Sequence, residues 1–152
     1  MSTIESYPKI SAEEAAARIF HGATVAFSGF TSAGAAKLIP RTLAARARDL
    51  HDRGLPFKLR ILTGASGGAS IDELLAQAEA MSYRAPYQTG PTLRDQINRQ
   101  EVEYVDMHLS HLPQTVLEGF YGKIDFAVVE ATEITSDGRV FLTSSIGASP
   151  AG

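Results

Sequence analysis

The residues best suited to chemistry form a loop of small and hydroxyl-bearing side chains at positions 28–34. This loop directly follows an apolar stretch, 23–27, that is typical of a short buried strand. Glycines let a ligand approach backbone N–H groups, and the hydroxyls of Ser28, Thr31 and Ser32 add donors. Such donors can bind a carboxylate or an acyl oxygen. The alternative is that the loop is only a tight strand-to-helix turn without a binding role. The candidate binding residues are Ser28, Gly29, Phe30, Thr31 and Gly34.

Two further loops of the same kind occur later in the chain, at 64–70 and 143–152. The first of them follows a predicted strand, 58–64, and the second follows the apolar run 140–142. In open α/β sheets, ligands bind just outside the carboxyl ends of the strands. We therefore expect the three loops to meet at one rim of the sheet, which places Ser28, Ser66 and Ser145 at the same end.

Three charged residues could take part in binding or catalysis. Glu130 ends an apolar strand pattern at 124–130, a position that favours a functional carboxylate, although a hydrogen-bonded structural role is the alternative. Arg84 and Arg94 lie on either side of a loop at 85–91. Either arginine could attract an acidic substrate or could lie on the solvated surface.

No motif for metal or nucleotide chemistry is evident. His108 and His111 have helical spacing, but Pro113 disfavours a helix through both, and no third ligand accompanies them. We predict no metal site. No Ser-His-Asp set can be argued from the sequence, and the first two loops lack nucleotide-binding patterns. We therefore assign no catalytic residue to this chain.

The scaffold for these residues alternates strands with helices. A strand, a small-residue loop and a helix follow one another twice, which predicts an α/β fold with a mostly parallel open sheet and crossover helices on both faces. The expected strands are 23–27, 58–64, 81–84, 102–106 and 124–130, the expected helices are 11–20, 36–53, 71–80, 92–99 and 113–119, and a turn is expected at 136–138.

Local signals refine this prediction. Ser11 with Glu14, and Thr92 with Asp95, have the spacing of a capping box at a helix start. The apolar run 126–129 does not alternate with polar residues, which is typical of a strand covered on both faces.

Composition bounds the class of protein. The 152 residues correspond to about one domain, and 44% hydrophobic with 20% charged residues predict a packed core. A net charge of −3 without a basic block argues against a nucleic-acid partner. The chain has no cysteine and no apolar run long enough for a membrane span. Because the first residues also lack a signal-peptide pattern, we expect a cytoplasmic protein with no membrane partner.

With these loops located, the sequence resembles the N-terminal part of the acetyl-CoA hydrolase/transferase family, which includes succinyl-CoA:acetate CoA-transferases. The likeness extends over nearly the whole chain from about residue 12. Each short motif alone is a weak signal, but their order and spacing taken together are specific to the family. The matching segments are 28–31 with Gly34, 62–66, 83–89, 103–109, 121–123, 129–135 and 143–147.

The resemblance implies an enzyme of two similar α/β halves with the active site between them. In such enzymes a glutamate of the second half attacks the acyl-CoA thioester, and CoA passes through a glutamyl-CoA thioester to a small carboxylate. Water as the acceptor gives hydrolysis. The resemblance thus implies a coenzyme A thioester as substrate and no permanently bound cofactor. The implied partners are an acyl-CoA, a small carboxylate and a second α/β half or a homo-oligomer.

The resemblance also assigns roles to residues of this sequence. It implies that the loop 28–34 faces the active-site cleft and that the Thr89 hydroxyl helps to hold the small carboxylate or acyl group. Glu130, Ser144 and Ser145 would lie near the floor of the cleft.

Residues 1–152 are therefore expected to form a single α/β domain, the N-terminal half of a longer enzyme, with little activity and a tendency to self-associate when alone. Two alternatives stay open. One is a non-catalytic binding or assembly module with the same fold. The other is a hydrolase that acts through Glu130.

Overall fold

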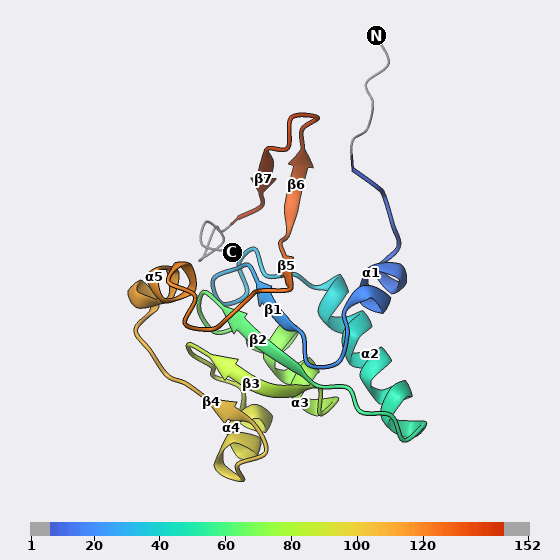
Figure 1. Ribbon diagram of the computed structural model, residues 1–152, viewed down its shortest axis with the longest axis vertical. Coiled ribbons are helices and arrows are strands. Elements are labelled where there is room, and N and C mark those ends of the chain that lie inside the picture. The colour runs from blue at the N-terminus through green and yellow to red at the C-terminus, as the bar shows by residue number, and fades with distance from the viewer. Residues whose placement is uncertain (1–6, 145–152) are drawn as a thin grey trace.

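The computed structural model describes residues 7–144, which fold into a parallel sheet with helices against it (Figure 1). In chain order the elements are α1 (Ala12–Arg18), β1 (Thr24–Phe27), α2 (Leu38–Asp52), β2 (Leu59–Thr63), the π-helical turn η1 (Ala69–Glu73), α3 (Leu74–Gln77), β3 (Met81–Ala85), α4 (Pro91–Asn98), β4 (Glu103–Tyr104), the 3₁₀ turn η2 (Leu109–His111), α5 (Leu112–Leu117), β5 (Phe126–Val128), β6 (Ala131–Ile134) and β7 (Val140–Leu142).

The main sheet has five strands in the order β4-β3-β2-β1-β5, and every neighbouring pair is parallel. β6 and β7 form a separate antiparallel hairpin that projects away from this sheet (Figure 1). The predicted α/β fold with a mostly parallel sheet is confirmed, and so is the expected turn between β6 and β7.

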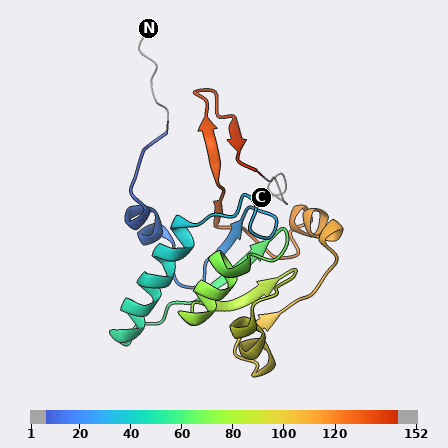
Figure 2. The same ribbon diagram turned by 180° about the vertical axis from the view of Figure 1, so that it is seen from behind.

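The connections explain where the helices lie. β1 to β4 are added to the sheet one after another in the same direction, so right-handed crossovers carry α2, α3 and α4 onto one face. Figure 2 shows α2 and α3 in front of the sheet. The chain then returns through α5 to place β5 on the far side of β1. The strand order therefore reverses between β1 and β5, which is the kind of position where open α/β sheets bind ligands.

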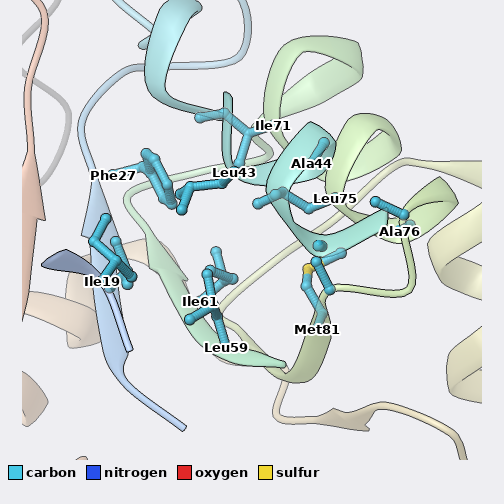
Figure 3. Close-up of a cluster of buried hydrophobic side chains, with 14 of the residues drawn as sticks. Ile19, Phe27, Leu43, Ala44, Leu59, Ile61, Ile71, Leu75, Ala76 and Met81 are labelled. Atoms are coloured by element: carbon cyan, nitrogen blue, oxygen red, sulfur yellow. The ribbon is translucent and has the colours of Figure 1, made fainter. Parts of the chain in front are cut away.

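The main core lies between the sheet and the helices of the first face. Apolar side chains of α2 and α3 pack there against β1, β2 and β3, as Figure 3 shows. Leu43, Leu59, Ile61 and Leu75 have no exposed surface. Burial of such side chains stabilises the fold by about 1.5–3 kcal/mol each.

A smaller cluster covers part of the opposite face. Leu62, Tyr83 and Ala85 of the sheet pack there with Leu112 of α5 and with Tyr121. Helices thus lie on both faces, as predicted, but the second face has much the thinner cover.

The helix starts include one confirmed cap and one wrong prediction. The Ser11 hydroxyl accepts a hydrogen bond from the backbone N–H of Glu14 over 3.1 Å, and the Glu14 carboxylate accepts from the Ser11 N–H, which confirms the capping box. Thr92 does not cap α4, because that helix begins at Pro91, and the Thr92 N–H donates to the carboxylate of Glu73 over 3.1 Å. A carboxylate from a distant turn thus replaces the predicted local cap.

β5 differs from its prediction in length and in surroundings. It is confined to Phe126–Val128, and Ala127 is exposed. Within residues 7–144, β5 is the outer strand beside β1 and is not covered on both faces. An apolar run shows that a strand prefers burial, but it does not show which neighbours cover it. In the part of the chain that the structure describes, no helix is long and apolar enough to cross a membrane.

Candidate functional site

An open cleft of about 620 Å³ lies at the carboxyl ends of β1 to β4. The loop after each of these strands contributes to its lining, because the ends of neighbouring parallel strands meet at one edge of the sheet. The lining residues are Phe30, Thr31, Gly64, Ala65, Ser66, Tyr87, Asp106, Met107, His108 and Leu109. The first two of the three predicted loops thus meet here, whereas most of the third, 143–152, lies outside the described residues.

The loop after β1 owes its shape to a tight backbone. Phe30 and Ala33 exchange two backbone hydrogen bonds of 2.9 and 3.0 Å. Gly29 has a φ of +117°, and a Cβ there would lie 2.8 Å from the Cα of Ala35, so a larger residue does not fit. This turn exposes half of Phe30 and the side chain of Thr31 at the edge of the cleft.

Ser28 lies behind that turn and is buried. Its hydroxyl donates to the carbonyl of Gly34 over 3.3 Å and accepts from the backbone N–H of Glu130 over 3.2 Å. The Ser28 N–H donates to the carbonyl of Val128 over 2.9 Å. The contact between Ser28 and Gly34 therefore stabilises the loop from within. Ser28 also joins the loop to the end of β5.

A pair of hydroxyls connects the loops after β2 and β3. The Oγ of Ser66 and the Oγ1 of Thr89 are 2.8 Å apart, and Thr89 is exposed. Ser66 lines the cleft and also accepts from the Gly68 N–H over 3.2 Å. The sequence-based candidates for substrate binding include Thr89 but not Ser66, which the structure places in the lining of the cleft. The available signal was its place in a small-residue loop directly after a strand.

Arg84 lies behind the cleft and has no exposed surface. Its guanidinium forms a two-pronged ion pair with Asp72, with distances of 2.8 Å from Nε to Oδ1 and 3.2 Å from Nη2 to Oδ2. Asp72 is also fully buried. Arg84 therefore neither attracts an acidic substrate from solvent nor lies on the surface, contrary to both expectations, whereas Arg94 on α4 is exposed.

The same carboxylate holds the loop after β2. Asp72 Oδ2 accepts the Gly67 N–H over 2.9 Å and lies 3.4 Å from the Ser66 hydroxyl. A Cβ on Gly67 would come within 2.7 Å of the Cβ of Ile71, so this loop packs directly on the π-helical turn η1. π-helical turns are often found at functional sites.

Glu130 lies at the base of the β6–β7 hairpin and not in the lining of the cleft. Lys37 Nζ donates to Glu130 Oε2 over 2.8 Å, and the Thr143 hydroxyl donates to Oε1 over 3.0 Å. The hydrogen bonds from Lys37 and then from Thr143 lower the pKa of Glu130 below its usual value of 4.5. Glu130 is thus an ionised carboxylate with two partners.

The remaining candidates are two serines and two histidines. Ser144 is exposed, and Ser145 lies outside the described residues. His108 lines the cleft, and its Nδ1 is 2.7 Å from the Ser110 hydroxyl. The rings of His108 and His111 are 5.8 Å apart. Among residues 7–144, no group of three potential ligands could hold a metal ion.

Comparison with known proteins relates this arrangement to a family of enzymes. The family model of the acetyl-CoA hydrolase/transferase N-terminal domain matches residues 1–152. The propanoyl-CoA:succinate CoA transferase of Escherichia coli strain K12 is 49% identical over 144 residues, which are 95% of this chain and 29% of that protein. The succinyl-CoA:acetate CoA-transferase of Clostridium kluyveri is 38% identical over 138 residues, 91% of this chain and 25% of the relative. The acetyl-CoA hydrolase of Schizosaccharomyces pombe is 39% identical over 138 residues, which are 86% of this chain and 26% of the relative.

Solved structures support the same fold. The crystal structure of the acyl-CoA transferase YdiF apoenzyme from Escherichia coli O157:H7 aligns with a TM-score of 0.59 at 18% identity, over 76% of this chain and 23% of that chain. Its thioester complex with CoA aligns with a TM-score of 0.54 over 75% and 23%. The chain spans less than a third of the length of each relative described here. On the match of the family model, the chain belongs to the acetyl-CoA hydrolase/transferase family and corresponds to its N-terminal domain.

Proposed function

We propose that this chain is the N-terminal domain of an enzyme that moves coenzyme A between an acyl-CoA, such as acetyl- or succinyl-CoA, and a small carboxylate. The reaction passes through a glutamyl-CoA thioester, and the nucleophilic glutamate lies outside the 152 residues. CoA is a substrate in this proposal and not a resident cofactor, and the enzyme is cytoplasmic. The carrying observation is the hydroxyl-lined cleft at the strand ends of a chain 49% identical to a CoA transferase.

The cleft offers suitable groups for a small carboxylate. Ser66 lines the cleft, and Thr89, which is not among the lining residues, is exposed beside it, so their hydroxyl pair can donate to a carboxylate oxygen. Thr31 adds a further hydroxyl to the lining. Tyr87 and Met107 add apolar surface for a short aliphatic chain. A few polar groups in a mainly apolar concave site are typical of small-molecule binding.

Glu130 does not fit the role of nucleophile or general base. It contacts Lys37 and Thr143 and lies outside the cleft lining. A lowered pKa makes a carboxylate a weaker base, whereas an effective general base has a pKa near the working pH. We therefore disfavour the hydrolase alternative that acts through Glu130.

The rest of the site must come from elsewhere. Attack on a thioester needs an oxyanion stabilised by donors, each worth about 3–4 kcal/mol, and two substrates held against each other. An open cleft on one domain provides only one wall for this. We propose that a second α/β half, or another copy of the protein, closes it.

The test compares this chain with the same chain joined to the polypeptide encoded after it. We expect turnover of acetyl-CoA, succinyl-CoA or propanoyl-CoA with acetate or succinate from the longer protein only. Mass spectrometry after addition of acyl-CoA should find a CoA adduct on a glutamate beyond residue 152.

Three outcomes contradict the proposal. Turnover by the isolated chain would show that it contains the catalytic residue, and an adduct on Glu130 would restore the hydrolase alternative. No turnover and no adduct in the longer protein would favour the non-catalytic binding or assembly module.

A further inference from the structure

The buried ion pair Arg84–Asp72 directly contacts the loop that carries Ser66. Arg84 Nη2 donates to the Ala65 carbonyl over 3.3 Å, and Asp72 accepts from the Gly67 N–H over 2.9 Å. The pair thus binds the backbone on both sides of Ser66. Arg84 also donates to the carbonyl of Ala85 at the end of β3.

Stability alone does not account for this pair. Removing two charges from water is costly, so a buried ion pair often stabilises a fold no better than apolar residues of similar size. Neither Arg84 nor Asp72 has exposed surface, and the cleft opens in front of them. Their contacts fix the position of one loop, which suggests that the pair serves the geometry of the cleft.

The pair also influences the direction of the hydroxyl donors. Ser66 has one hydroxyl proton and two neighbouring acceptors, Thr89 Oγ1 at 2.8 Å and Asp72 Oδ2 at 3.4 Å. Arg84 and the Gly67 N–H already donate to that carboxylate oxygen. Because they offset its charge, the shorter bond from Ser66 to Thr89 is favoured. The Thr89 proton then remains available to a ligand in the cleft.

We propose that Arg84 and Asp72 are positioning residues that set the Ser66–Thr89 hydroxyl pair to donate to an anionic group in the cleft, a small carboxylate. This inference rests on the proposed function. Without the guanidinium, the carboxylate of Asp72 attracts the Ser66 proton and Thr89 donates to Ser66. A carboxylate ligand then meets hydroxyl lone pairs instead of a donor.

The experiment uses the longer protein, in which succinate and free CoA are titrated separately by calorimetry. We expect Arg84→Gln to raise the dissociation constant for succinate by about tenfold or more, the loss of one hydrogen bond to a charged group. We expect the constant for CoA to change by less than about twofold, because free CoA has no carboxylate for the Ser66–Thr89 pair to bind. Arg84→Lys keeps the charge and should recover part of the succinate affinity.

Two controls separate positioning from simple stability. Leu93→Ala removes a fully buried side chain of α4 that belongs to the main core, and it should weaken the fold without weakening succinate binding. If Arg84→Gln does not fold, the neutral double variant Asp72→Asn/Arg84→Gln replaces it. It disturbs the contacts to the Ala65 carbonyl and the Gly67 N–H that position Ser66, so succinate binding should weaken, but by less than in Arg84→Gln because no carboxylate competes for the Ser66 proton. The proposal is overturned if succinate binding is unchanged, if CoA binding falls equally, or if Leu93→Ala reproduces the loss.

Hydrogen exchange on the isolated chain distinguishes failure of this inference from failure of the proposed function. In the double variant, the amides at 66–68 should exchange faster, whereas those of α2 should not. If the wild-type longer protein does not bind succinate at all, the proposed function is wrong. If amide exchange at 66–68 is unchanged in the double variant, the ion pair does not hold the loop and the present inference is wrong.

Discussion

The backbone N–H of Glu130 donates a hydrogen bond to the hydroxyl of Ser28 over 3.2 Å, and this contact joins positions 102 residues apart. Ser28 follows β1 and Glu130 follows β5, so the bond spans the two neighbouring strands between which the strand order reverses. The sequence pattern and the family resemblance had indicated both residues as candidates for substrate binding. Their observed contacts hold the loop after β1 against the end of β5, while Phe30 and Thr31 of that loop line the cleft.

Ser28→Ala should destabilise the isolated chain by about 1–3 kcal/mol, because it leaves the Glu130 N–H and the Gly34 carbonyl without their buried partner. Urea unfolding followed by circular dichroism measures this change. Ser32→Ala is the matched control, since Ser32 is exposed in the same loop and its substitution should stay within about 0.5 kcal/mol. Equal effects of the two substitutions would contradict the assigned role of Ser28.

Glu130→Gln should remove part of the acid sensitivity of the fold. The pKa of Glu130 is lower in the folded chain than its usual value of 4.5, mainly because of Lys37 and then Thr143. The ionised carboxylate therefore stabilises the folded state above pH 4.5, and this contribution is lost as the pH falls through the folded-state pKa.

Urea midpoints measured between neutral pH and the lower limit of stability would show this as a shallower pH dependence in Glu130→Gln. Lys37→Met removes the first cause of the lowered pKa and should produce a similar change. A wild-type curve that matches both variants would show that the ion pair does not contribute.

Thr89→Val should weaken carboxylate binding in the longer protein, because valine keeps the shape of threonine but lacks the hydroxyl that contacts Ser66. We expect the KM for the carboxylate acceptor to rise by about tenfold or more, the cost of a hydrogen bond to a charged group. Thr89→Ser retains the hydroxyl and should stay close to the wild type. Steady-state kinetics at varied acceptor concentration provide the comparison, and equal KM values in the two variants would exclude the hydroxyl as a ligand.

The isolated chain should self-associate at high concentration. Leu117 at the end of α5 and Phe120 just after it are 75% and 72% exposed, and Phe141 of the β6–β7 hairpin is 48% exposed. Exposed apolar groups of this kind mark interaction surfaces. Sedimentation velocity over a dilution series should show association that Leu117→Ser/Phe120→Ser reduces. A single monomeric species at every concentration would reject this prediction.

Local sequence signals predicted the helices and strands well but not their surroundings. The capping box of Ser11 was readable because both partners lie within one helical turn. The cap of α4 could not be predicted in this way, because the carboxylate that accepts from the Thr92 N–H belongs to Glu73 of η1, a different element. The burial of Arg84 was equally hidden, since charged side chains are normally exposed and only the fold reveals its pairing with Asp72.

The sequence by itself determined the alternation of strands and helices and the small-residue turns at the strand ends, because periodicity, glycine and capping act over a few residues. It also carried the family motifs. Only the tertiary structure decided which turns share a cleft, that Ser66 stands beside Thr89, and that β5 lies at the outer side of β1. These relationships depend on strand order and on contacts between distant residues, which no local pattern encodes.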